Sequence, residues 1–136
     1  MRGASVLQDA FEEKRGAALR VFVVWEPVIL TDFWPPGRTV LGRVADPRAV
    51  QFWDQGHLVS QRMREMTQAN PSIHTENWPR MGRIIWDLAA VYGKDARWDA
   101  AMPPPAFAAG PVVAVVDELR KSLEDQGVGT GATSAR

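Results

Sequence analysis

The sequence predicts an α/β fold in which helices flank a mixed sheet. Two strongly apolar strand candidates, Leu19–Trp25 and Ile84–Tyr92, alternate with helical segments along the 136 residues. In the first candidate, residues 21–25 show no alternation of apolar and polar side chains, which is typical of a strand buried on both faces of a parallel sheet. A helix precedes this strand almost from Met1, so we expect no strand before that helix.

The composition is that of one ordinary globular domain, 46% hydrophobic and 24% charged. We expect this domain at 1–125 and a disordered tail over the small, polar residues 126–136. Sixteen basic residues balance 16 acidic ones, so no net field would attract nucleic acid. The sequence contains no cysteine, which excludes thiol nucleophiles, disulfides and thiolate metal sites. Because no stretch resembles a signal peptide or a membrane span, we expect a cytoplasmic protein that does not bind membranes.

Apolar residues at helical spacing predict four helices. The first, Gly3–Arg15, ends before Gly16, a common C-terminal stop. A short second helix is expected from Asp46, because an acidic N-cap followed by proline is a strong start signal. His57–Gln68 and Pro111–Asp125 each place their apolar side chains along one stripe, which predicts two more helices.

The connections are marked by proline and glycine. Ile29–Val44 is a long connection, and its strongest breaker is Trp34-Pro35-Pro36-Gly37. That turn could contact a partner, although packing over the sheet is favoured. Gly93-Lys94-Asp95 predicts a hairpin turn that leads from the second strand into a short return strand, Ala96–Trp98.

Three strings resemble a group of bacterial thioredoxin-like proteins. They are Val21-Phe22-Val23-Val24-Trp25-Glu26-Pro27-Val28, Asp46-Pro47-Arg48-Ala49-Val50-Gln51-Phe52-Trp53-Asp54, and Trp86-Asp87-Leu88-Ala89-Ala90-Val91-Tyr92 with Ala96-Arg97-Trp98. The order of helix, buried strand, long connection, hairpin and C-terminal helix is also that of a thioredoxin-like fold without its first strand. The resemblance implies a relative of thiol or selenol oxidoreductases.

The chain departs from this group at the redox motif. In the group, a strand leads into a Cys-x-x-Cys or selenocysteine-x-x-Cys pair, whose thiol is acidified by the helix N-terminus. Here the segment from Arg2 to Leu7 resembles the helix just beyond such a pair, so no redox residue is carried over and no cofactor is expected. Two explanations stay open. Either the reading frame starts too late and a strand and motif lie upstream, or the chain is a genuine redox-inactive form.

A chain this short has a consequence for partners. In a thioredoxin-like sheet the missing strand is central, so both strand candidates would be left with unpaired backbone groups. Uncharged edges of this kind recruit other strands. We therefore expect a protein partner or self-association through the sheet edge. The alternative to a redox-inactive oxidoreductase relative is a non-enzymatic binding or scaffold module that uses this edge and Trp-rich loops.

Few polar residues suggest chemistry, and we predict no catalytic, cofactor or metal site. Glu26 follows a buried strand, a common position for a site in α/β sheets, although such a carboxylate more often caps nearby amides. Asp54 lies three residues before His57, which permits an Asp–His pair without a nucleophile. His57 and His74 lack the spacing of metal ligands. Asp87 interrupts an apolar strand, and we expect it at an edge or paired with an arginine.

The aromatic and basic residues favour packing over nucleic-acid binding. The one neighbourhood that combines both contains Arg62, Arg64, Trp78, Arg80 and Arg83. Acidic neighbours dilute its charge, so we do not expect it to bind nucleic acid. Most of the six tryptophans are expected to pack in the core or to cover a sheet edge; they are Trp25, Trp34, Trp53, Trp78, Trp86 and Trp98.

Overall fold

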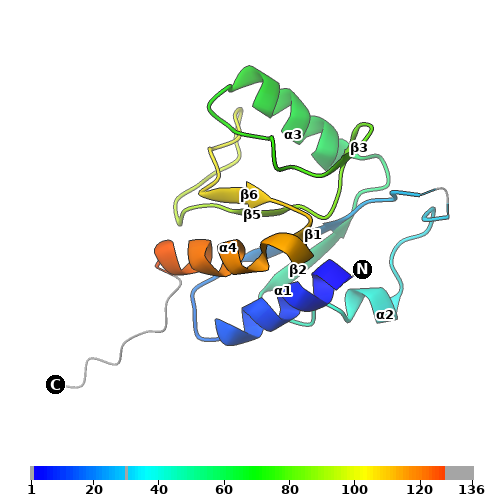
Figure 1. The fold of residues 1–136 in the computed structure, drawn as a ribbon. Helices are drawn as coiled ribbons and strands as arrows, with labels where there is room; N and C mark the ends of the chain where they lie inside the picture. The colour runs from blue at the N-terminus through cyan, green and yellow to red at the C-terminus, as the bar shows by residue number, and fades with distance from the viewer. Residues whose placement is uncertain (1, 30, 128–136) are drawn as a thin grey trace.

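The computed structural model describes residues 2–29 and 31–127, which form a mixed α/β fold (Figure 1). Four helices and three two-stranded sheets occur in these residues. Most of the tail predicted at 126–136, from residue 128 onward, lies outside the described residues. The elements in chain order are α1 (Arg2–Glu13), β1 (Val21–Trp25), α2 (Arg38–Leu41), β2 (Ala49–Trp53), α3 (Leu58–Ala69), β3 (Arg80–Met81), β4 (Ile84–Ile85), β5 (Ala89–Val91), β6 (Phe107–Ala109) and α4 (Val112–Asp125).

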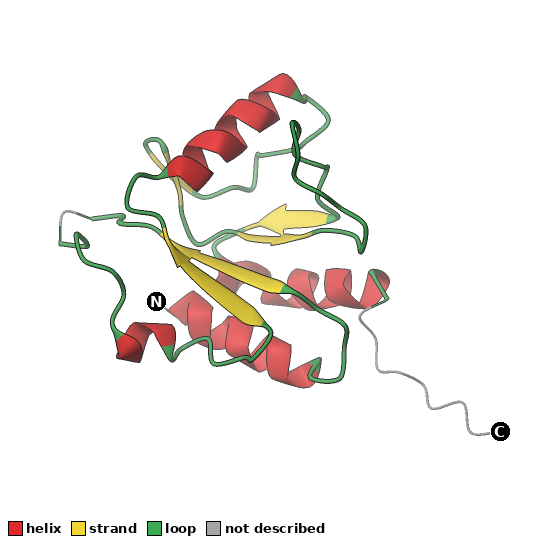
Figure 2. Ribbon diagram, turned by 180° about the vertical axis from the view of Figure 1, so that it is seen from behind, coloured by secondary structure: helices red, strands yellow, loops and turns green. Residues whose placement is uncertain are grey.

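The first and last helices pack against each other on one side of the strands. Figure 1 shows α1 and α4 side by side, and Figure 2, from behind, shows the strands β1 and β2 in front of α1. Their apolar stripes are buried through residues such as Phe11, Leu119 and Leu123. Arg120 adds two hydrogen bonds to the Glu13 carboxylate, at 2.9 and 3.0 Å. The structure thus confirms both terminal helices that the apolar periodicity predicts.

The strands β1 and β2 form a parallel pair, in register from Val21 opposite Ala49 to Trp25 opposite Trp53. One face of this pair is covered, because Val21 packs in a core cluster with residues of α1. The other face is not, since the side chain of Phe22 is 65% exposed. The prediction that this strand is buried on both faces is therefore wrong, because the helices cover one face only.

The helix expected from Asp46 is also wrong, because the segment that follows pairs with β1 as a strand. The Asp46 carboxylate accepts three hydrogen bonds from the Arg48 amide and guanidinium, at 2.7 to 2.9 Å. The guanidinium also donates to the carbonyl oxygens of Phe11, Lys14 and Ala17 at the end of α1. Asp46 thus orients an arginine that caps α1. The hydrogen bond from Arg48 holds the pKa of the Asp46 carboxyl below its usual value.

The strand predicted over Ile84–Tyr92 is broken at Asp87, whose φ of 51° lies in the left-handed region. Before the break, β4 pairs with β3, and after it β5 pairs antiparallel with β6. The predicted hairpin with a return strand at Ala96–Trp98 is therefore wrong. The true partner, β6, follows the proline run at 103–105, which keeps the connection extended.

The helix α3 covers a core cluster of its own and confirms the helix predicted at 57–68. Buried in this cluster are Met63, Met66, Ile73, Trp78, Ile85 and Met102. Among the tryptophans, Trp78 is buried, whereas Trp34 is 84% exposed and Trp86 and Trp98 are exposed by more than a third. The prediction that the Trp34 turn packs over the sheet is thus wrong.

Candidate functional site

Three elements meet at the carboxyl end of the β1–β2 sheet. Glu26 directly follows β1, Asp54 directly follows β2, and α3 starts at Leu58. The Asp54 amide continues the ladder of the sheet by donating to the carbonyl oxygen of Trp25 at 2.8 Å. Because the strands are parallel, their carboxyl ends lie together, as is usual for sites in open α/β sheets.

The carboxylate of Glu26 is buried and is held by two residues of the α3 region. Only 8% of its side chain is exposed. The Ser60 hydroxyl lies 2.8 and 3.0 Å from its two oxygens, and the Ser60 amide donates at 3.3 Å. Nδ1 of His57 lies 3.1 Å from Glu26 Oε2. We call Glu26, His57 and Ser60 the Glu26 cluster. Its carboxylate lies at a helix N-terminus, where negative charge is favoured.

The position of Ser60 excludes it as a nucleophile. Its residue exposure is 1%, and its hydroxyl oxygen accepts a hydrogen bond from the Ile85 amide at 3.0 Å. The hydroxyl therefore links α3, the end of β1 and the short strand β4. A hydroxyl this deeply buried has no access to a substrate.

The imidazole of His57 is the part of the cluster nearest to solvent, with 33% of its side chain exposed. The Asp54–His57 side-chain pair that the spacing permits does not form, because Asp54 Oδ2 accepts the Val59 amide at 2.7 Å and caps α3. In a Ser–His–acid triad the histidine lies between the other two groups. Here the carboxylate of Glu26 is central. The cluster therefore orients the His57 imidazole without activating a hydroxyl.

The remaining polar candidates form no second site. His74 is exposed and lies 3.4 Å from Glu76. Asp87 is half-buried, and burial raises the pKa of its carboxyl above the usual value. No arginine pairs with Asp87 in residues 2–29 and 31–127. The same residues hold no group of three side chains suited to a metal ion.

The uncovered face of the β1–β2 sheet is strongly apolar. We call its four side chains the apolar face: they are Phe22, Val24, Val50 and Phe52, exposed by 65, 37, 50 and 49%. The rings of Phe22 and Phe52 have centroids 6.4 Å apart. Sequence reasoning missed this face because the run 21–25 suggested burial on both sides. Along β2 only Gln51 is polar, so the sequence of this strand offered no clear alternation to reveal the face.

One edge of β1 has no strand beside it in the described residues. The ladder to β2 begins with the Val21 amide donating to Arg48 O at 3.3 Å and ends at Trp25 O. Because backbone groups of successive strand residues point to opposite edges, Val21, Val23 and Trp25 face β2. The N–H and C=O groups of Phe22 and Val24 therefore face the other edge.

Comparisons with models of protein families, with curated proteins and with solved structures each find no match for this chain. Within residues 2–29 and 31–127, every helix is too short or too polar to span a lipid bilayer. The described residues offer two features that bear on function. One is the Glu26 cluster, whose polar atoms bind one another, and the other is the apolar face with the unpaired edge of β1.

Proposed function

We propose that this chain is a redox-inactive, thioredoxin-like interaction module that forms a dimer through β1. The thioredoxin-like part is supported by the order of α1, β1, the antiparallel pair β5–β6 and α4, and by the packing of α1 on α4. The strand β2, placed between β1 and α3, is a departure from the expected order. The lack of cysteine supports the redox-inactive part, because disulfide exchange requires a thiolate.

The observation that carries the dimer is the edge of β1. Phe22 and Val24 have outward backbone groups on this edge, and their side chains lie on the apolar face. An antiparallel pair centred on Val23 sets Phe22 opposite Val24 of the second copy, so these two residues exchange N–H···O=C bonds in both directions. The same register sets Arg20 opposite Glu26 of the second copy, whose carboxylate is buried and bound by Ser60 and His57 and so adds no ion pair. A parallel pair would instead bring the two Arg20 side chains together.

A second copy fits this edge better than an unrelated strand. The pairing is two-fold symmetric and closes on itself, which is the commonest form of assembly. The strand 21–25 contains neither a charged residue nor a proline, the residues that protect natural sheet edges. Pairing also places Phe22 next to Val24 of the second copy on the apolar face, which covers exposed apolar surface of both.

The test is the mass in solution of the full chain over a range of concentrations, by light scattering after size exclusion. We expect a species of twice 15.1 kDa for the wild type. Val24→Lys places a charge at the edge and should give a monomer. Val50→Lys places the same charge on the same apolar face but on β2, away from the edge, and should remain a dimer.

Hydrogen exchange gives a second readout of the same pairing. The amides of Phe22 and Val24 should become protected as the concentration rises, while the Val50 amide should not change. A wild-type monomer at all concentrations would refute the dimer. Equal loss of dimer in Val24→Lys and Val50→Lys would show packing through the apolar face and so overturn pairing at the edge.

A further inference from the structure

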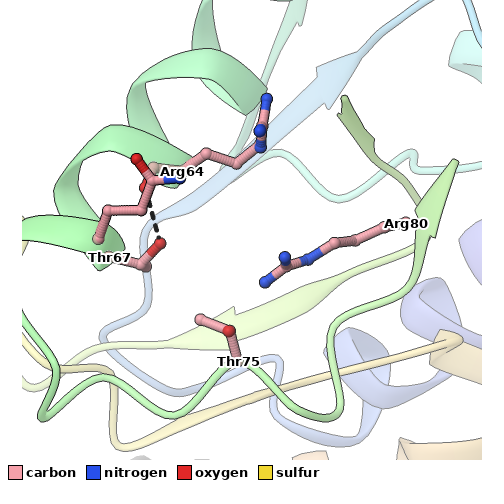
Figure 3. A pocket seen from close by; sticks show the side chains of 5 residues that line it. Arg64, Thr67, Thr75 and Arg80 are labelled. Carbon is pink, nitrogen blue, oxygen red and sulfur yellow. Dashed lines mark hydrogen bonds between the residues drawn. The ribbon is translucent and has the colours of Figure 1, made fainter. Parts of the chain in front are cut away.

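An open depression lies between α3 and the segment that leads into β3. Its lining side chains are Arg64, Thr67, Gln68, Thr75 and Arg80. Figure 3 shows the Arg64 guanidinium directed away from Arg80, so the two cations do not converge on one point. A single ligand would not be held by both, and the apolar face is therefore the stronger candidate for a contact.

The apolar face of the β1–β2 sheet is open to solvent. Figure 2 views this sheet from the side opposite α1, and no helix lies over the two strands in that view. All four side chains of the face are exposed by more than a third, and the rings of Phe22 and Phe52 lie beside each other. None of the four is polar. An uncovered apolar patch of this kind is typical of an interaction surface.

The proposed dimer places two apolar faces on the same side of one sheet. Residues directly opposite each other in paired strands share a face of the sheet. The antiparallel register centred on Val23 sets Phe22 opposite Val24 of the second copy. The strands β2 and β1 of one copy and β1 and β2 of the other therefore carry all their exposed apolar side chains on one side. The helix α1 of each copy lies on the other side.

The size of the face decides which copies can pack through it. A fully exposed phenylalanine side chain presents about 200 Å², and a valine about 120 Å². With the observed exposures, one chain offers about 300 Å² of apolar area. Two single chains facing each other would bury about 600 Å² in total, which is the size of a crystal contact. Two dimers would bury about 1,200 Å², which reaches the range of specific interfaces.

We propose that two dimers pack face to face through their apolar faces and form a tetramer. This assembly rests on the proposed dimer, because the face of one chain is too small to hold a partner alone. Sheets that pack in this way lie about 10 Å apart and interdigitate their side chains, to which Phe22 and Phe52 contribute most of the area. Each dimer presents the same surface, so every face is covered once and the assembly closes with dihedral symmetry, a common form for tetramers.

The test is sedimentation equilibrium of the full chain at increasing concentration, with the mass compared with the 15.1 kDa of one chain. The wild type should shift from twice to four times this mass. Val50→Lys places a charge on the face but away from the edge of β1, so it should stay a dimer at every concentration. Val113→Lys is the matched control. Val113 lies on α4 and is exposed by 45%, close to the 50% of Val50, and its variant should still form the tetramer.

The outcomes separate the two levels of assembly. A wild type that remains a dimer up to about 1 mM overturns the tetramer and leaves the dimer in place. A wild-type monomer overturns both. A tetramer that persists in Val50→Lys would place the contact elsewhere and so overturn the role of the apolar face. If the wild-type dimer forms no tetramer but binds phosphatidylcholine vesicles, and Val50→Lys does not, the face is assigned to a lipid surface and the tetramer is overturned. Circular dichroism checks that the variants fold.

Discussion

Removal of the Ser60 hydroxyl tests whether the Glu26 cluster holds the fold together. Ser60→Ala deletes one oxygen in a site that is 1% exposed. The hydroxyl donates to the Glu26 carboxylate and accepts from the Ile85 amide, at 2.8 and 3.0 Å. Alanine can do neither, so the variant leaves a buried N–H without an acceptor and a buried carboxylate with one donor fewer.

The expected loss follows from these two groups. A buried polar group left without its partner costs about 1 to 3 kcal/mol, and more when the group is charged. Alanine has a higher helix propensity than serine, which returns about 0.5 kcal/mol because Ser60 lies within α3. We therefore expect Ser60→Ala to lower the free energy of unfolding by about 2 to 4 kcal/mol.

Urea unfolding followed by circular dichroism measures this change. Gln61→Ala is the matched control, because Gln61 is the next residue of α3 and bonds only with exposed groups. It should change the free energy of unfolding by no more than about 0.5 kcal/mol. In a double-mutant cycle, Ser60→Ala and Glu26→Ala should couple by about 1 kcal/mol or more. A loss below about 1 kcal/mol in Ser60→Ala, or additive effects in the cycle, would show that the contact between Ser60 and Glu26 does not stabilise the fold.

Two further predictions concern Asp46 and Arg48, whose side chains connect the start of β2 to the end of α1. Arg48→Met should lower the free energy of unfolding by about 3 to 5 kcal/mol, because it leaves Asp46 buried without its partner and the end of α1 uncapped. Urea unfolding checks this, and a loss under about 1 kcal/mol would contradict it. The pKa of Asp46 is lower in the folded state, so its contribution is complete above the unfolded pKa of about 3.9 and is lost as pH falls through the folded pKa. The advantage of the wild type over Asp46→Asn should therefore shrink when unfolding is repeated below about pH 4, and a constant difference would contradict it.

Three of the four predicted helices were correct, because their signals are local, whereas the helix from Asp46 was wrong and the short α2 lies within the predicted connection Ile29–Val44. The apolar residues that define one face of α1, α3 or α4 all lie within that helix, so each pattern can be recognised without knowing what the helix packs against. The strand at 21–25 was also predicted, since a run of β-branched and aromatic residues is a local preference.

The sheets could not be predicted, because each depends on a partner far away in sequence. Asp46-Pro47 is a strong local start signal for a helix, yet the following residues gain more by pairing with β1. Asp87 broke the second strand because aspartate tolerates a positive φ better than most residues. The strand β6 is short and follows three prolines, so it lacks a recognisable strand pattern. Neither segment alone contains a signal for the pairing of β5 with β6.

The candidate site was half visible in the sequence. The place of Glu26 at the end of a strand pointed to it, and His57 was recognised as lying near a helix start. Ser60 was not considered, because a serine inside a helix looks like an ordinary surface residue. Its burial follows only when α3 packs against β4.

The Glu26 cluster and the edge of β1 are physically connected. The cluster connects Glu26, the residue directly after β1, to the start of α3 and, through Ser60, to β4. A strand fixed at its carboxyl end in this way keeps its outward N–H and C=O groups in an extended, regular row. Such an edge loses little conformational entropy when a second strand pairs with it, and preorganisation of this kind raises affinity. In the proposed dimer, the buried polar residues would therefore aid pairing indirectly, by keeping Phe22 and Val24 in the conformation that pairing requires.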